Sequence, residues 1–236
     1  MKYKAIMFDL DGTLIPMDYD VFTKYYFKGI CKKAAENGIT DSENLVKVIW
    51  AGTKDMVMND GSRPNEEAFW ERFTKETGIE KEAVNDFFLD YYRNEFGLVK
   101  NVVEDNPLAK VAVDTAREKA QYVILATNPL FPMDGQRQRM SWVDLKENDF
   151  DLVTCYESDY YCKPNPQYFT EICKKFDLDP KECLMIGNDE NEDMYAATQA
   201  GFSCFLVTDT MIKSEKHPWD GPRGSFEEMV EMLKAL

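Results

Sequence analysis

The sequence predicts an α/β fold, in which a doubly wound parallel sheet carries an inserted α-helical domain. Short apolar runs recur along the chain, and helical patterns separate them. Between the first run and the second lies a long stretch, residues 17–100, that has only helical patterns. Alternating strands and helices are typical of a parallel sheet with helices on both faces.

The predicted strands are short and rich in Val, Ile, Leu and Met. They are residues 4–8, 122–126, 152–155, 183–186 and 204–207. These runs are apolar at consecutive positions, without the polar alternation of a strand that faces water on one side. Strands of this kind are buried on both faces, as in parallel sheets.

Helices are predicted around these strands at residues 108–119, 166–176 and 192–200. A final amphipathic helix is predicted over residues 226–236, where Ser225 is a favourable N-cap. Together with the strands, these helices complete the doubly wound arrangement.

The inserted stretch has helical patterns at residues 21–36, 42–50, 66–77 and 81–94. Glycines close two of these patterns, at the C′ position that favours this residue. Aromatic residues recur at helical spacing in the last two, which indicates that their faces pack on each other. We therefore expect two units, a core of residues 1–16 and 101–236 and a helical insert of residues 17–100.

The composition excludes several classes of partner. The chain has 236 residues and a formal net charge of −15, which disfavours binding to nucleic acid and to anionic membrane surfaces. Its apolar runs are too short for a signal peptide or a membrane-spanning helix. The six cysteines form no C-x-x-C pair, and a single histidine leaves a zinc site almost without ligands. We expect a protein of the reducing cytoplasm.

Polar residues that could carry chemistry follow four of the predicted strands. They are the segment 9–13 (Asp-Leu-Asp-Gly-Thr), the pair Thr127-Asn128, Lys163, and the acidic segment 187–193. Ligands of open parallel sheets bind at the carboxyl ends of the strands, so we expect these four features to meet in one crevice.

Several carboxylates in one crevice need a cation, and oxygen ligands without His or Cys favour Mg²⁺. A carboxylate beside Mg²⁺ and a lysine can attack phosphorus, because the positive charges offset the repulsion between two anions. A second carboxyl can protonate the leaving oxygen and then activate water. A threonine hydroxyl and backbone N–H groups can hold the phosphoryl oxygens. The set suffices for phosphoryl transfer through an aspartyl-phosphate.

The ordered set resembles motifs I to IV of the haloacid dehalogenase (HAD) superfamily. The resemblance implies a Rossmann-like core with a helical cap of the first type (C1) at residues 17–100. It implies that Asp9 is the nucleophile and a metal ligand, and that Asp11 is the general acid/base and binds the metal through its backbone carbonyl. It also implies that Thr127, with Asn128, binds phosphoryl oxygens and that Lys163 orients Asp9 and neutralises charge.

The fourth motif departs from the family pattern. Asn188 stands where the metal-ligating Asp is expected, Asp189 follows it, and Asp193 occupies the usual position of the second acid. A carboxamide oxygen can ligate Mg²⁺ but lacks charge, which Asp189 could supply. Both Asn188 and Asp189 are therefore candidate ligands, and the choice between them stays open.

We expect Mg²⁺-dependent hydrolysis of a small phosphate monoester from a phosphorylated metabolite. Asp11 argues for phosphorus chemistry, because dehalogenases of the superfamily attack carbon and do not keep this second acid. One alternative is a phosphomutase with the same motifs. Another is a non-catalytic binding module, for which Asn188 is the only support. The substrate and the oligomeric state are not predicted.

Two arginines after the second motif, Arg137 and Arg139, could meet an anionic substrate group. Their place close after this motif favours them over the arginines of the helical insert, and the sequence does not distinguish the two residues.

Overall fold

A computed structural model describes residues 2–236 and contains a six-stranded parallel sheet. The strand order is β3-β2-β1-β4-β5-β6. The α/β prediction is confirmed, and the five predicted strands lie within two residues of their expected bounds. The sixth was not predicted, because its two residues form no apolar run. The strands are β1 (Ala5–Phe8), β2 (Tyr122–Leu125), β3 (Leu152–Val153), β4 (Cys183–Gly187), β5 (Ser203–Val207) and β6 (Arg223–Gly224).

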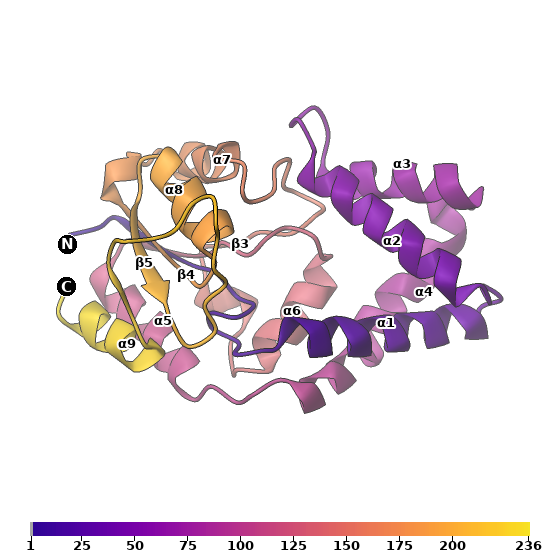
Figure 1. The fold of residues 1–236 in the computed structure, drawn as a ribbon, viewed down its shortest axis with the longest axis horizontal. Helices are drawn as coiled ribbons and strands as arrows, with labels where there is room; N and C mark the ends of the chain where they lie inside the picture. The colour runs from indigo at the N-terminus through magenta and orange to yellow at the C-terminus, as the bar shows by residue number, and fades with distance from the viewer. Residues whose placement is uncertain (1) are drawn as a thin grey trace.

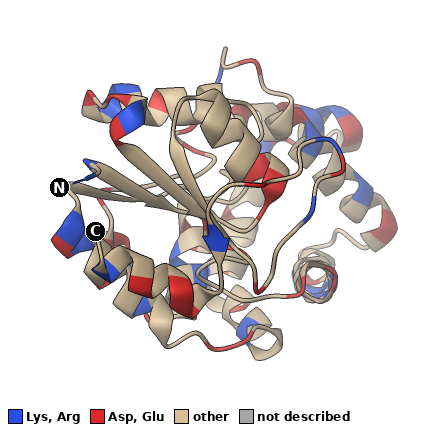
Figure 2. Ribbon diagram, turned by 60° about the vertical axis from the view of Figure 1, so that its left-hand side comes forward, with Lys and Arg blue, Asp and Glu red and all other residues tan. Residues whose placement is uncertain are grey.

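The central strand β1 is buried on both faces, as the sequence predicts. Ile6 and Phe8 belong to one apolar cluster and Ala5 and Met7 to another. Strands β1–β5 contain no Lys, Arg, Asp or Glu, so they are tan in Figure 2, while charged residues lie mainly on helices and loops. Strands β1–β5 therefore contribute apolar packing, and charged side chains at the edge of the sheet come from the loops.

Helices cover both faces of the sheet (Figure 1). The face of Ile6 and Phe8 is covered by α5 and α9, and the other face by α7 and α8. Ser225 caps α9 with a capping box, because its side chain and that of Glu228 bond reciprocally to backbone N–H groups. The bounds are α5 (Leu108–Lys119), α7 (Gln167–Phe176), α8 (Ala196–Gln199) and α9 (Phe226–Lys234).

The helix predicted over residues 192–200 differs from the structure. Its first part is a π-helical turn, η4 (Glu190–Tyr195), which leads into the short α8. Asp189 caps this turn, since its side chain accepts hydrogen bonds from the backbone N–H groups of Asn191 and Glu192. The helix thus begins earlier than the apolar spacing indicates, because a polar cap sets its start.

One core helix was not predicted at all. Helix α6 (Met133–Ser141) has the sequence MDGQRQRMS, and it buries Gln136 and Arg139 together with Met140. A buried face that is partly polar has no apolar periodicity, which is why the pattern was missed.

The four helices between β1 and α5 are α1 (Tyr19–Glu36), α2 (Ser42–Val57), α3 (Asn65–Thr77) and α4 (Lys81–Asn94). We call residues 19–94 the helical segment; it lies beside the sheet in Figure 1. Helix α2 continues beyond the predicted end at residue 50. Its Gly52 faces Phe69 of α3, and a Cβ there would lie 2.6 Å from the phenyl ring, so the glycine permits close packing of the two helices. That residues 17–100 form a domain of their own stays a prediction.

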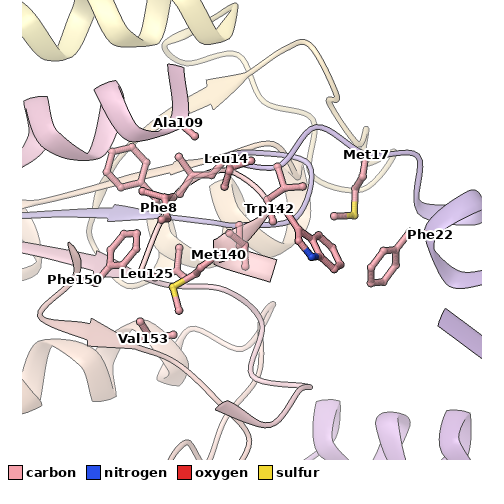
Figure 3. Close-up of a cluster of buried hydrophobic side chains, with 14 of the residues drawn as sticks. Phe8, Leu14, Met17, Phe22, Ala109, Leu125, Met140, Trp142, Phe150 and Val153 are labelled. Atoms are coloured by element: carbon pink, nitrogen blue, oxygen red, sulfur yellow. The ribbon is translucent and has the colours of Figure 1, made fainter. Parts of the chain in front are cut away.

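The apolar core continues from the sheet into the helical segment. Figure 3 shows Phe8 and Leu125 of the sheet in one cluster with Trp142, with Met17 just before the helical segment, and with Phe22 at the start of that segment. A short helix, η1 (Phe96–Val102), leads from α4 back toward α5. Packing therefore positions the first turn of α1 against the sheet edge.

The chain leaves and re-enters the sheet region at neighbouring points. Glu104 N–H donates to the carbonyl of Pro16 at 3.2 Å, and the side chain of Asn106 donates to the carbonyl of Leu14 at 3.0 Å. A third link joins the start of α3 to the loop after β3, where the N–H of the fully buried Asn65 donates to the carbonyl of Asp159 at 2.9 Å.

Among the helices of residues 2–236, none combines the length and the apolarity of a membrane-spanning helix. All six cysteines are free thiols, and five of them are buried.

Candidate active site

The sheet order brings β1 and β4 together at the point where the winding of the sheet changes direction. Phe8 pairs with Ile186, and the N–H of Asp9 donates to the carbonyl of Ile186 at 2.9 Å. The loops after these two strands therefore meet at the carboxyl edge of the sheet, where ligands of such folds bind.

A cavity of about 220 Å³ lies at this edge. All eight residues that the sequence analysis singled out for the site line it, so the four features do converge. They are Asp9, Asp11, Thr127, Asn128, Lys163, Asn188, Asp189 and Asp193. Their chemical roles stay predictions.

Lys163 lies between two carboxylates. Its Nζ is 2.7 Å from Asp9 Oδ1 and 2.6 Å from Asp193 Oδ1, and its side chain is almost fully buried. Burial alone would lower the pKa of Lys163, but the carboxylates of Asp193 and Asp9 outweigh it, so its pKa lies well above the usual value. The residue is a fixed cation at neutral pH, and it holds Asp9 in one orientation.

Asp193 organises the loop after β4. Its Oδ2 accepts hydrogen bonds from the N–H groups of Asn188 and Asp189, each at 3.0 Å, while its Oδ1 meets Lys163. Gly187 makes room for this carboxylate, because a Cβ there would lie 2.2 Å from Asp193 Oδ2. The Asp193 carboxylate therefore fixes the backbone of the loop after β4 and the position of the Lys163 ammonium.

The turn after β1 is tight and requires a glycine. Gly12 has φ of +82°, and a Cβ at this position would lie 2.3 Å from Asn188 Nδ2. The next residue, Thr13, places its hydroxyl 3.1 Å from Asp9 Oδ2 and 3.1 Å from Asn188 Oδ1. Thr13 was not among the predicted site residues, although its hydroxyl four positions after Asp9 was visible in the motif.

The two candidate metal ligands of the fourth motif have different surroundings. Asn188 Nδ2 donates to the carbonyl of Thr210 at 2.8 Å, which leaves Oδ1 on the side of Thr13 and Asp9. Asp189 Oδ1 accepts from the N–H groups of Asn191 and Glu192, at 2.7 Å and 2.8 Å. Because the Thr13 hydroxyl contacts both Asp9 and Asn188, the carboxamide oxygen of Asn188 is favoured over Asp189 as the metal ligand beside Asp9.

Arg139 of α6 is fully buried and forms an ion pair with Asp11. Its guanidinium also bonds Gln136 and lies 4.2 Å from the ring centre of Phe131. The other carboxylate oxygen of Asp11, Oδ1, is buried and has no hydrogen-bond partner among residues 2–236. Burial raises the pKa of Asp11, and Arg139 acts in the opposite direction.

This pairing separates the two arginines that the sequence could not distinguish. Arg137 is half exposed and pairs with Asp134 and Glu147 at the surface, whereas Arg139 is turned inward. Arg139 is therefore a site residue that sequence reasoning considered and did not select.

Glu192 is a further residue of the cavity that was not selected as a site residue. Asn128 connects it to Lys163: Asn128 Nδ2 donates to Glu192 Oε2 at 2.9 Å, and the N–H of Lys163 donates to Asn128 Oδ1 at 3.1 Å. Burial raises the pKa of Glu192 to about 7, and the charges of Asp189 and Asp193 act in the same direction. Asn128 thus links three loops of the site.

The raised pKa of Glu192 predicts a pH-dependent stability in metal-free protein. Between the ordinary glutamate pKa and about pH 7, the folded state binds more protons than the unfolded state, so the free energy of unfolding falls as pH rises. Glu192→Gln removes this contribution to the pH dependence of the free energy of unfolding. From roughly pH 5 to 8 the variant should gain about 3 kcal/mol relative to the wild type.

Urea denaturation in EDTA would measure this difference. Glu171→Gln, which changes a glutamate of a surface ion pair, is the control and should follow the wild type. Equal slopes for Glu192→Gln and the wild type would contradict the assignment.

The charge of the cavity bears on what it can bind. Five carboxylates and a single lysine line it, and its lining residues include no His or Cys. Within residues 2–236, no three His, Cys, Asp or Glu side chains are arranged as a metal site. The expected donors include only two carboxylates, those of Asp9 and Asp189, beside the Asp11 carbonyl and the Asn188 carboxamide. This all-oxygen set fits a hard cation such as Mg²⁺.

Comparison with known proteins gives a consistent result. Residues 3–201 match the family described as haloacid dehalogenase-like hydrolase. The chain is 25% identical over 234 residues to an N-acetylmuramic acid 6-phosphate phosphatase of Pseudomonas putida, covering 98% of this chain and 92% of the relative. It is 25% identical over 221 residues to a glyceraldehyde 3-phosphate phosphatase of Methanothermobacter thermautotrophicus, covering 90% and 89%.

A solved structure, 2-haloacid dehalogenase from Pseudomonas syringae pv. Tomato, resembles the fold with a TM-score of 0.61 over 99% of each chain. Its sequence identity is 15%, so the likeness is one of fold.

Proposed function

The chain belongs to the haloacid dehalogenase-like hydrolases, and from this membership we propose that it is a Mg²⁺-dependent phosphatase of a small phosphate monoester. The proposed reaction runs through an aspartyl-phosphate on Asp9. The observation that carries it is the buried Lys163, whose ammonium holds Asp9 Oδ1 at 2.7 Å. A carboxylate fixed beside a cation is the arrangement that attack on an anionic phosphoryl group requires.

In the first step, a carboxylate oxygen of Asp9 attacks phosphorus and the bond to the ester oxygen breaks. Lys163 reduces the repulsion between the attacking carboxylate and the phosphoryl group. Thr127 lines the cavity, and its backbone is fixed because its carbonyl accepts hydrogen bonds from Thr154 and Tyr168. It would bind a phosphoryl oxygen.

Asp11 would protonate the departing alkoxide and then take a proton from the water that cleaves the aspartyl-phosphate. Its carboxyl lies two residues from Asp9 and lines the same cavity. Arg139 holds one of its oxygens, which leaves Oδ1 available for proton transfer. Haloacid dehalogenases of the family attack carbon and lack this acid, so Asp11 favours the phosphatase.

The metal would be held by Asp9, the backbone carbonyl of Asp11, and Asn188 or Asp189. When bound, Mg²⁺ would supply positive charge for the phosphoryl oxygens. The need for it follows from the cavity, because five carboxylates and one lysine repel a phosphate dianion.

The helical segment would act as the cap that selects the substrate, a phosphorylated metabolite. Its α1 contributes Tyr19 and Phe22 to the lining of the cavity, which supports this role. Six free thiols are consistent with a reducing compartment, and we include the cytoplasm in the proposal on that ground.

The direct test is the hydrolysis of p-nitrophenyl phosphate with and without Mg²⁺. We expect release of nitrophenol and inorganic phosphate that EDTA abolishes and Mg²⁺ restores. With a phosphorylated sugar carrying a labelled phosphoryl group, a phosphatase releases the label as inorganic phosphate. Retention of the label in an isomerised sugar phosphate would instead identify the phosphomutase.

Magnesium should also stabilise the folded protein. A ligand that binds only the folded state at about 100 times its dissociation constant contributes about 2.7 kcal/mol, which corresponds to a rise in Tm of roughly 5–11 °C for a chain of this size. Thermal unfolding with MgCl₂, against NaCl of equal ionic strength as the control, measures the shift. An equal Tm in both salts would contradict the metal site.

A further inference from the structure

A second cavity, of about 170 Å³, lies next to the one that contains Asp9. Residues of α1–α4 provide most of its lining, and the segment after β2 and Tyr156 after β3 provide the rest. We call it the cap cavity. Four residues line both cavities, namely Tyr19, Phe22, Leu130 and Phe131. One ligand can therefore extend from the cavity that contains Asp9, which we call the catalytic cavity, into the cap cavity.

The lining of the cap cavity is apolar and aromatic. Eleven of its eighteen lining residues are Phe, Tyr or Trp, and none is charged. The hydroxyls of Tyr26 and Tyr92 bond each other at 2.8 Å, so both are already partnered. Thr53 Oγ1 likewise donates to the carbonyl of Ile49. Trp70, also in the lining, has a buried Nε1 without a hydrogen-bond partner among residues 2–236. The predominantly apolar lining nevertheless favours a group that is itself apolar, because a polar group would lose its water and gain few hydrogen-bond partners.

Its volume sets the size of that group. A cavity of about 150 Å³ lined by apolar side chains is known to accommodate benzene. The cap cavity is of similar size, and its aromatic walls favour stacked or edge-to-face contacts with a ring. Trp50, one wall of the cavity, is half exposed, so this side of the cavity lies near the surface.

The two cavities also lack a cation for a second anionic group. Lys163 is the single Lys or Arg lining either one, and it is already held between Asp9 and Asp193. A carboxylate on the alcohol part of the substrate would meet the five acids of the catalytic cavity or the uncharged walls of the cap cavity. Both surroundings disfavour it.

We propose that the substrate is a phosphate monoester of an uncharged alcohol carrying an apolar group about the size of one aromatic ring, which binds in the cap cavity. This inference rests on the proposed phosphatase function. For benzyl phosphate, water and the ester give benzyl alcohol and inorganic phosphate: the phosphorus–oxygen ester bond breaks, and the alcohol oxygen receives a proton.

Two probes separate the cap cavity from the chemistry. Benzylphosphonate and methylphosphonate have a carbon–phosphorus bond that hydrolysis does not cleave, and they differ only by the ring. With Mg²⁺ present, fluorescence of Trp50 and Trp70 in the cavity wall reports binding. We expect benzylphosphonate to bind roughly tenfold or more tightly, because burial of even one methylene in an apolar pocket can give that factor.

A filling variant tests the location. Thr53→Phe places a ring in the cap cavity and should reduce the preference for benzylphosphonate to near one. Lys47→Phe adds the same ring to the exposed face of α2 and should retain the preference. If Thr53→Phe does not fold, Thr53→Leu fills part of the cavity. Its preference for benzylphosphonate over methylphosphonate should be smaller than that of the wild type and of Lys47→Phe, but still greater than one.

Turnover then compares benzyl phosphate with glyceraldehyde 3-phosphate and N-acetylmuramic acid 6-phosphate. We expect kcat/KM for benzyl phosphate to exceed both by roughly tenfold or more. Equal binding of the two phosphonates, or faster turnover of the carboxylate-bearing ester, would overturn the inference while leaving a phosphatase. Tight binding of benzylphosphonate without turnover of any ester would support the cap cavity and overturn the proposed function.

Discussion

Replacing Asp9 with Asn is expected to lower kcat by roughly 10⁴-fold or more, because the carboxamide is a poor nucleophile and cannot form the aspartyl-phosphate. The substitution preserves size and leaves Lys163 paired with Asp193, so the fold should be retained. Release of nitrophenol from p-nitrophenyl phosphate measures the loss, at saturating substrate and with Mg²⁺ present.

The control for this experiment is to show that the Asp9→Asn protein is folded and still binds phosphonates. Circular dichroism and the fluorescence of Trp50 should show that the Asp9→Asn protein keeps its structure. A variant that retains a substantial part of the wild-type kcat would exclude Asp9 as the nucleophile. If part of the variant is unfolded, its kcat is calculated from the concentration of folded protein alone.

The largest change in stability is expected for Arg139→Met. This substitution leaves the buried carboxylate of Asp11 without its cation, and removal of one partner of a buried ion pair costs about 3–5 kcal/mol. For a chain of this length the Tm should fall by roughly 6–20 °C. Thermal and urea denaturation in EDTA measure the effect without a contribution from metal.

Arg137→Met is the matched control, since it changes the same residue type on the same helix. Its ion pairs with Asp134 and Glu147 are at the surface, and such pairs contribute at most about 1 kcal/mol. The double variant Arg139→Met with Asp11→Asn should recover part of the loss, because no buried charge remains unpaired. Equal losses for Arg137→Met and Arg139→Met would show that the Asp11 contact is not important for stability.

The strands were predictable because each is buried on both faces. A run such as Ala5–Phe8 cannot satisfy two apolar faces except inside a covered sheet, so its composition alone indicates its environment. The helices α4 and α5 were predicted with their full bounds for a related reason, since each has a regular apolar stripe.

Helix α6 and the C-terminal part of α2 were not predicted from the sequence. Helix α6 turns Gln136 and Arg139 inward, and a partner for a buried arginine cannot be identified from local sequence. In the part of α2 beyond residue 50, Gly52 packs closely against Phe69 of another helix. Both contacts join residues that are not neighbours in the sequence, so a local pattern does not reveal them.

For the cavity that contains Asp9, the sequence predicted which residues line it but not the hydrogen bonds between them. Asp9, Thr127 and Lys163 could be placed together because each follows a strand of one parallel sheet. The bonds between them depend on side-chain direction: Thr13 is shared by Asp9 and Asn188, and Asn128 links Lys163 to Glu192. The cap cavity was not predicted, because aromatic residues at helical spacing are more often closely packed than arranged around an open space.

The adjacent exit and entry of the chain near Pro16 and Glu104 have a consequence for divergence between related sequences. Since both connections sit side by side, insertion, loss or exchange of the intervening helices changes no strand pairing. Changes within residues 19–94 can thus leave the strands and the loops at the carboxyl edge of the sheet in place. Transplanting this segment from one relative into another would be a practical route to altered substrate preference, with Pro16 and Glu104 as the junctions.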